Sequence, residues 1–299
     1  MVEPASTRVL VAGASGYIGR ELVGQLEAQG FTVLRLVRRE PLSDTEFRWD
    51  PHAGTVDETA IDLADVVINL AGASTGKLPW TPRYKREILR SRVEGTRTIA
   101  EAIRRSATPP NVFLSGSAVG YFGSRPGEVL SDDSAKGTGF LSDVVDAWEK
   151  AARLTPASTR LVIFRTGIVV GEGGAFTPLN LLTRFLLGSR LGSGEQYWPW
   201  ISLHDEAAAI IHLLRSEFSG VVCLVGPTPA TAKTVTTTLA ASMGKPHWFA
   251  VPGFAIRMLG DAGKDLILVD ENVHPRTLLE LGFSFTHTTI AQAIDEFAR

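Results

Sequence analysis

The sequence lacks the features that mark several large classes of protein. Its 299 residues contain one cysteine, Cys223, so a disulfide framework is excluded and a reducing compartment is expected. The formal net charge is only -2, so nothing indicates nucleic acid or an anionic membrane as a partner. Neither a secretory signal nor an apolar run of about 20 residues, as a membrane span requires, is present. These absences predict a soluble, cytoplasmic protein.

One kind of catalytic site is missing as well. The six histidines are scattered, and no carboxylate accompanies them at ligand spacing, so no metal site is predicted.

What the sequence does contain is an alternation of strand and helix patterns. Short apolar runs at 8–12, 32–37, 66–70, 112–115 and 161–166 alternate with helical patterns at 17–29, 82–105 and 141–154. This alternation is typical of an α/β protein whose parallel sheet is covered by helices on both faces. We predict a doubly wound Rossmann domain in residues 1–170. Residues 171–299 are predicted to form a smaller C-terminal substrate lobe, with some segments returning to the main sheet.

A glycine-rich loop follows the first predicted strand and runs Gly13-Ala14-Ser15-Gly16-Tyr17-Ile18-Gly19. Gly13 permits a tight turn, Gly16 lets the backbone approach a pyrophosphate, and Gly19 lets the helix lie close to the sheet. The first helical turn, with Tyr17 and Ile18, offers N–H groups to the phosphates. The loop therefore predicts a dinucleotide site, the alternative being a turn that binds nothing.

The end of the second strand distinguishes the two nicotinamide cofactors. NAD-binding versions of this fold carry an acidic residue there, which holds the ribose 2′-hydroxyl. Here the residues are Arg38 and Arg39, and guanidinium groups pair bidentately with a phosphate. We therefore predict NADP(H), with Ser15 adding a hydroxyl to the same pocket. The alternative is that both arginines are solvated, and the nearby Glu40 weakens the argument.

Two more turns fall where adenine and ribose contacts usually lie. Asp50 follows the third strand, and Leu70-Ala71-Gly72 follows the fourth. Both are predicted to contact the cofactor, although each has the alternative role of a turn former.

Motifs spread over nearly the whole chain indicate a family. They are Asn69-Leu70-Ala71-Gly72, Ser91-Arg92-Val93-Glu94-Gly95-Thr96, Ser115-Gly116-Ser117-Ala118-Val119-Gly120-Tyr121, Arg165-Thr166-Gly167-Ile168-Val169 and Trp198-Pro199-Trp200-Ile201. With them the chain resembles the extended short-chain dehydrogenase/reductases. More narrowly, it resembles an atypical epimerase-family branch that includes sugar-nucleotide epimerase-like and cell-division inhibitor-like proteins. The resemblance implies a Rossmann fold, with Ser115 among the cofactor contacts.

The tyrosine–lysine pair of short-chain dehydrogenases is absent. In Tyr-x-x-x-Lys both side chains share one helix face, and the lysine lowers the pKa of the tyrosine that moves the substrate proton. The tyrosine position falls here at Phe140 or Leu141, and the lysine position at Val144 or Val145. The serine that orients the substrate oxygen is matched by Ser117.

Two interpretations of the function follow. In the first, the chain is an oxidoreductase or epimerase in which Tyr121 moves the proton, assisted by Ser117 and by Arg125 as a nearby cation. The alternative for Tyr121 is packing or substrate contact. In the second, the chain binds NADP(H) without redox chemistry and acts as a sensor or interaction protein, for example in the regulation of cell division.

The substrate itself is not specified by the sequence. Trp200 and His204 are candidates for the substrate cleft, with packing as the alternative. In the resembling branch a histidine often follows the Trp-Ile pair, but here that residue is Ser202. Fold analogy suggests a sugar nucleotide, for which Arg165, Arg184, Arg190 and Arg276 are isolated candidates. Either a monomer or a homodimer is compatible with the sequence.

Overall fold

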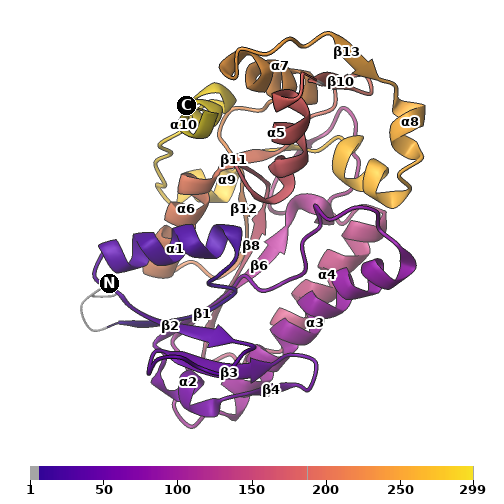
Figure 1. Cartoon of the computed structure of the whole chain (residues 1–299). Coiled ribbons are helices and arrows are strands. Elements are labelled where there is room, and N and C mark those ends of the chain that lie inside the picture. The colour runs from indigo at the N-terminus through magenta and orange to yellow at the C-terminus, as the bar shows by residue number, and fades with distance from the viewer. Residues whose placement is uncertain (1–6, 187, 299) are drawn as a thin grey trace.

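A doubly wound, mostly parallel sheet forms the centre of the protein (Figure 1). The computed structural model describes residues 7–186 and 188–298. Its eight-stranded sheet has the order β12-β8-β6-β5-β1-β2-β3-β4. In chain order the strands are β1 (Arg8–Ala12), β2 (Thr32–Val37), β3 (Glu46–Asp50), β4 (Thr55–Val56), β5 (Val66–Asn69), β6 (Val112–Ala118), β8 (Arg160–Thr166) and β12 (Gly220–Leu224). Only β3 and β4 pair antiparallel, and the order reverses beside β1 as in a Rossmann fold. The predicted fold class is confirmed.

Helices cover both faces of this sheet. On one face α1 (Tyr17–Ala28) packs with α6 (Leu203–Arg215), and on the other lie α2 (Glu58–Leu63), α3 (Pro82–Arg105) and α4 (Phe140–Ala152). Successive side chains of β1 point to opposite faces. Accordingly Val9 and Val11 belong to the core under α1 and α6, while Leu10 and Ala12 belong to the core under α2 and α3.

Local sequence explains where the helices begin and end. The Thr81 hydroxyl accepts a hydrogen bond from the Tyr84 N–H, and Pro82 occupies the first turn, so α3 starts as predicted. The helix α1 is followed by Gly30, whose φ of 85° suits glycine.

One strand is longer than the sequence predicted. The strand expected at 112–115 continues to Ala118, because Gly116 and Ser117 pair with Phe164 and Arg165 of β8. This extension carries Ser117 to the carboxyl edge of the sheet, beside the end of β8.

The chain after Gly171 builds a smaller lobe with a core of its own. Its helices are α5 (Thr177–Arg184), α7 (Ala232–Ser242), α8 (Gly253–Arg257) and α10 (Ile290–Ala298). Short parallel pairs join β10 (Ser189–Leu191) to β13 (Phe249–Val251), β11 (Trp200–Ser202) to β9 (Ile168–Val170), and β14 (Asn272–Val273) to β7 (Val129–Leu130). Within the same stretch, α6, β12 and α9 (Arg276–Glu280) return to the main sheet, where Leu278 of α9 joins the core under α1 and α6. The boundary at residue 170 stays a prediction.

Two absences hold for the part of the chain that is described. No helix there is both long and apolar enough to cross a membrane. No group of three or more histidine, cysteine, aspartate or glutamate side chains there is arranged to hold a metal ion.

Candidate cofactor-binding and catalytic site

The glycine loop joins the carboxyl end of β1 to the start of α1. The Gly16 N–H donates to the Gly13 carbonyl at 2.9 Å, closing a tight turn. A Cβ added at Gly19 would lie 2.1 Å from the Gly13 oxygen, and one at Gly13 would lie 2.9 Å from the Ala71 nitrogen. No side chain caps α1, so the N–H groups of its first turn are available to an anion. The loop fits the pyrophosphate of a dinucleotide.

The turn after β5 lies directly beside this loop. The Leu70 N–H donates to the Ala12 carbonyl at 2.9 Å, and the Ala71 N–H donates to Asn69 Oδ1 at 3.1 Å. Asn69 is itself fully buried and donates to Thr96 Oγ1 at 2.8 Å. The predicted residues Leu70 and Ala71 are therefore held next to Gly13, at the edge where a dinucleotide binds in this fold.

The two arginines after β2 differ in their surroundings. Arg39 makes a bidentate pair with Glu46, at 2.7 Å and 2.6 Å, and this pair lowers the pKa of Glu46 to about 2. Arg38 is exposed, and among residues 7–186 and 188–298 its side chain has no ion-pair partner. Arg38 is thus the arginine that is available to a phosphate.

Three other predicted cofactor residues have local roles in the structure. Asp50 Oδ1 accepts hydrogen bonds from the N–H groups of His52 and Ala53, at 2.9 Å and 3.2 Å, which is the turn-forming role. Ser115 is fully buried within β6. Ser15 is exposed, and its carbonyl accepts a hydrogen bond from Arg20 at 2.7 Å.

Tyr17 connects the loop to the second half of the chain. Its ring occupies space left by the glycines of 171–174. A Cβ at Gly171 would lie 1.9 Å from the Tyr17 hydroxyl oxygen, and one at Gly173 would lie 2.5 Å from the ring. Burial raises the pKa of Tyr17 above its usual value. The side chain therefore serves packing, while the backbone N–H stays in the anion-binding turn.

Ser117 belongs to a buried charged cluster at the carboxyl end of β6. Its hydroxyl donates to Glu149 Oε1 at 2.8 Å. Arg165 donates to both oxygens of the same carboxylate, at 2.8 Å and 3.1 Å. Both charged side chains are at most 4% exposed. Because the Ser117 proton is committed to Glu149, the hydroxyl offers only its lone pairs to a ligand.

Tyr121 lies on the other side of Arg165. The guanidinium carbon is 3.6 Å from the centre of the Tyr121 ring, a close cation–π contact. The cation on the face of the Tyr121 ring is therefore Arg165, whereas Arg125, the cation that the sequence suggested, pairs with Glu128 at 2.7 Å. Arg165 reaches the ring because its strand lies beside β6, with Arg165 opposite Ser117.

Apolar packing occupies the place where the tyrosine–lysine pair would stand. Phe140 begins α4 and packs edge-on against Trp80, with ring centres 5.5 Å apart. Lys85 of α3 lies 4.2 Å above the Phe140 ring and pairs with Asp261. Neither Phe140 nor Leu141 can transfer a proton, so the first turn of α4 offers no proton donor at this position.

The two predicted substrate residues, Trp200 and His204, make no hydrogen bond or ring contact with the cluster of Ser117, Tyr121 and Arg165 among the described residues. Trp200 is 2% exposed, and its indole donates to the Thr228 carbonyl at 2.8 Å, so it has the packing role. His204 starts α6 and faces α1, where its ring contacts Gln25 at 3.2 Å. The packing of α6 on α1 places His204 beside Gln25, and its ring also lies 6.2 Å from the ring of His287, in the segment before α10.

Two carboxyl groups, those of Glu206 and Glu271, are buried with no ion-pair partner among the described residues. Glu206 Oε1 accepts from the Thr166 hydroxyl at 2.6 Å, while Oε2 has no hydrogen-bond partner in the described residues. Burial raises the pKa of Glu206 to about 8. Burial also raises the pKa of Glu271 well above its usual value, with Asp265 and Asp270 adding to the effect.

Comparison with known proteins agrees with this geometry. The model of the NAD-dependent epimerase/dehydratase family matches residues 9–226. The chain belongs to this family. A domain of unknown function (DUF1731) matches residues 251–297.

Relatives of this family member resemble it over almost their full length. An epimerase family protein of Mycobacterium leprae is 36% identical over 96% of this chain and 94% of its own. The epimerase family protein SDR39U1 of Mus musculus is 32% identical over 97% and 99%. The crystal structure of human SDR39U1 with NADPH superimposes with a TM-score of 0.89 at 30% identity, covering 98% and 99% of the two chains.

The sequence did not reveal the residue that pairs with Arg165 in the candidate catalytic site. Arg165 interrupts an apolar strand and was assigned to a possible diphosphate site, but the structure pairs it with Glu149. A charged residue within a buried strand signals a buried counter-charge. Nothing in the sequence indicated which of the many acidic residues supplies it.

Proposed function

We propose that this chain binds NADP(H) and is an oxidoreductase or epimerase of the short-chain dehydrogenase/reductase type. The observation that carries the proposal is the glycine loop, closed against the Leu70-Ala71 turn with the first turn of α1 uncapped. The loop would hold the pyrophosphate, and Arg38 would hold the 2′-phosphate. When bound, the nicotinamide supplies or accepts a hydride. The presence of NADPH in the human SDR39U1 crystal supports the choice of cofactor.

The chain's own part of the chemistry is proton transfer. We assign it to the Tyr121 phenol, which lies just after β6, the strand that carries Ser117. Arg165 positions the Tyr121 ring through the face contact, and Glu149 fixes Arg165. Ser117 offers lone pairs to a substrate hydroxyl. The substrate would carry a hydroxyl or carbonyl group; its class, including a sugar nucleotide, is left to the experiment.

Arg38→Ala tests the cofactor. We expect NADPH to bind about ten- to a hundredfold more weakly, since a charge-assisted contact of about 1.5–3 kcal/mol is lost. The affinity for NADH should not change. Fluorescence titration of both cofactors measures these affinities.

The matched control for that titration is Arg104→Ala, an exposed arginine near the end of α3. It should leave both affinities unchanged. Equal affinity of the unaltered protein for NADH and NADPH would refute the choice of NADP(H).

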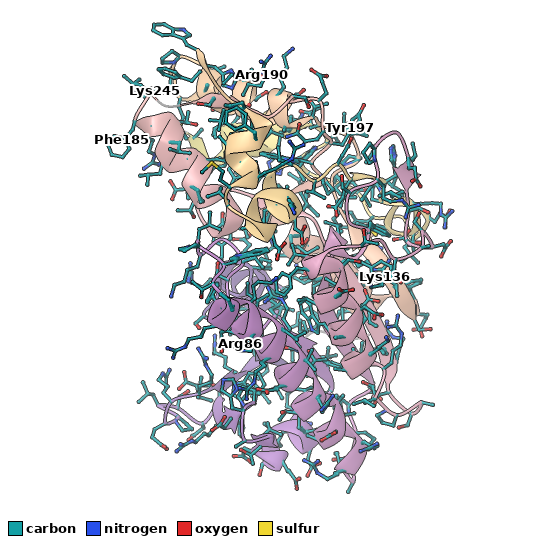
Figure 2. The ribbon with its side chains drawn as sticks, turned by 90° about the vertical axis from the view of Figure 1, so that its right-hand side faces the viewer. Arg86, Lys136, Phe185, Arg190, Tyr197 and Lys245 are labelled. Atoms are coloured by element: carbon teal, nitrogen blue, oxygen red, sulfur yellow. The ribbon has the colours of Figure 1, made fainter. Side chains whose placement is uncertain are left out.

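Tyr121→Phe tests the proton donor. A screen of hydroxyl and carbonyl substrates, followed by NADPH absorbance, first identifies a turnover. In Tyr121→Phe that turnover should fall by about 10²–10⁴-fold, because a positioned general acid contributes this much. NADPH affinity should be retained. Tyr197→Phe, in the C-terminal lobe (Figure 2), is the control and should remain active. Undiminished turnover in Tyr121→Phe would rule out its assignment as the acid.

A second function is favoured by one observation. The first turn of α4 carries Phe140, sealed against Trp80, where relatives with the usual pair have their proton donor. A non-catalytic NADP(H) sensor, for instance in the regulation of cell division, is consistent with this packing. Tight NADPH binding without turnover across the screen would support the sensor over the enzyme.

A further inference from the structure

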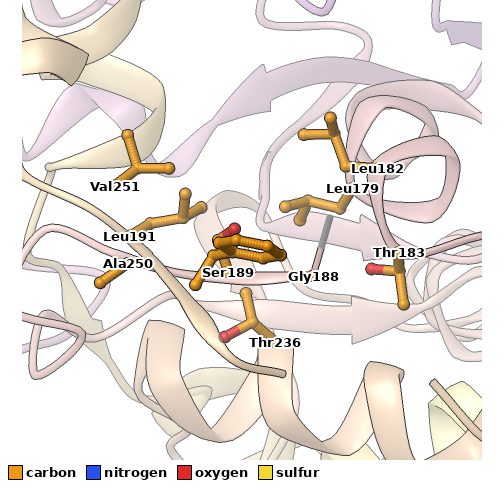
Figure 3. A pocket seen from close by; sticks show the side chains of 10 residues that line it. Leu179, Leu182, Thr183, Gly188, Ser189, Leu191, Thr236, Ala250 and Val251 are labelled. Atoms are coloured by element: carbon orange, nitrogen blue, oxygen red, sulfur yellow. The ribbon is translucent and has the colours of Figure 1, made fainter. Parts of the chain in front are cut away.

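The C-terminal lobe contains an apolar cavity that the proposed chemistry does not use. Its volume is about 340 Å³, and it lies between α5, α7, β10 and β13. Figure 3 shows Leu179 and Leu182 of α5 on one side, Leu191 and Val251 of the paired strands on another, and Thr236 of α7 below. This volume falls within the range of about 300–1,000 Å³ that is usual for small-molecule sites.

The cavity has a buried floor and an open, apolar rim. Thr183, Leu191 and Thr236 are all less than a tenth exposed and form the floor. Leu182 and Phe249 are 44% and 54% exposed at the rim. Leaving such side chains in water costs free energy that an apolar ligand would recover. The site therefore suits a hydrocarbon group.

The segments that form the rim carry positive charge only. Residues 181–192 and 244–260 contain Arg184, Arg190, Lys245 and Arg257 but no aspartate or glutamate, although the whole chain has a net charge of -2. The two segments are held together by the pairing of β10 with β13. An anionic group on the ligand complements this charge.

One of these cations lies at the end of the cavity that Gly188 lines. A Cβ at Gly188 would be 3.1 Å from the Pro246 carbonyl oxygen, so Lys245 is adjacent to that end. His247 contacts the Thr236 hydroxyl at 3.1 Å on the same side. Arg184 pairs with Glu172, and the side chain of Arg190 lies against Gly194. Arg190, Lys245 and Arg257 have no ion-pair partner among the described residues. Of these three, Lys245 is next to the Gly188 end of the cavity, and it is the cation that we consider for the ligand.

We propose that this cavity binds a long-chain carboxylate, with its hydrocarbon chain between α5 and the β10–β13 pair and its carboxylate at Lys245. The site is separate from the glycine loop, so binding does not depend on NADP(H). We expect the ligand to bind as a single molecule and not as a membrane or micelle. The reason is that a cavity with side walls and a buried floor encloses one hydrocarbon chain, whereas a flat apolar face would not.

Calorimetric titration of the full chain with hexanoate, octanoate, decanoate and dodecanoate, without cofactor, tests the proposal. Affinity should rise about fourfold for each methylene that enters the cavity. Leu182→Glu should weaken dodecanoate binding at least tenfold, because a carboxylate at the rim opposes both the chain and its head group. Leu42→Glu is the control, since Leu42 is 79% exposed in the Rossmann half of the chain, and it should bind normally.

The charged end is tested separately. Lys245→Gln should weaken dodecanoate binding about two- to fivefold, as expected for an exposed ion pair, and leave dodecanol binding unchanged. Arg86→Gln, on α3 and far from Lys245 in Figure 2, should affect neither ligand. Absence of dodecanoate binding, or equal binding by Leu182→Glu, would overturn the proposal. So would sedimentation with phosphatidylglycerol vesicles, or Leu182-dependent dimerisation, in a protein that does not bind monomeric dodecanoate.

Discussion

Replacing Arg165 with methionine is expected to lower the free energy of unfolding by about 3–5 kcal/mol. The substitution leaves the Glu149 carboxylate in a strand–helix interior where it is 1% exposed. Of the groups that now satisfy this carboxylate, only the Ser117 hydroxyl and the half-exposed Arg153 would remain. Urea denaturation of the purified variant measures the change.

The same carboxylate provides the control for this experiment. Arg153 also contacts Glu149 Oε2, at 3.2 Å, but its side chain is 49% exposed. Arg153→Ala should therefore cost less than about 1 kcal/mol. The double variant Arg165→Met with Glu149→Met should recover most of the loss, because no unpaired charge stays buried. A loss in the double variant as large as in Arg165→Met alone would show that packing, not charge, dominates.

The second large effect is on the pH dependence of stability. The pKa of Glu206 is raised from 4.5 to about 8, so the folded protein keeps this proton while the unfolded chain releases it above pH 4.5. The unfolded state then binds fewer protons, and stability falls as pH rises from about 4.5 to about 8. A shift of this size corresponds to roughly 5 kcal/mol.

Glu206→Gln should remove that part of the slope. We expect the variant to be close to the unaltered protein at pH 5 and clearly more stable at pH 9, as measured by urea denaturation across this range. Part of the fall persists, since the raised pKa of Glu271 acts in the same direction. Glu217→Gln, an exposed carboxylate just after α6, should keep the full slope. A slope in Glu206→Gln equal to that of the unaltered protein would contradict the assignment.

The structure of the proposed cofactor site could be predicted from local sequence to a large degree. The loop from Gly13 to Gly19, the strand before it and the helix after it are contiguous, so their geometry depends on short-range rules. The roles of single side chains were less predictable. Asp50 satisfies its own turn, and Arg39 is held by Glu46, because neighbouring polar groups compete with a ligand for the same atoms.

The surroundings of Tyr121 and the cavity of the C-terminal lobe are formed by residues that are distant from one another in the sequence. Arg165 meets Tyr121 only through the pairing of β6 with β8, a register that no local pattern specifies. The cavity combines residues from 179 to 251, and each of its segments alone resembles ordinary apolar packing. His204 was placed by helix packing, not by its neighbours along the chain.

The contact between Tyr17 and the glycines of 171–174 has a consequence for how the sequence can change. An aromatic ring at position 17 leaves no room for a side chain at Gly171 or Gly173, and these residues lie more than 150 positions away along the chain. A substitution on one side of this contact requires a matching substitution on the other. An alanine at position 173 fits only if residue 17 is smaller than tyrosine, and a smaller residue at position 17 with glycine kept at 173 leaves a void. In the evolution of this chain, therefore, the phosphate loop and the entrance to the second lobe are expected to vary as one inherited unit.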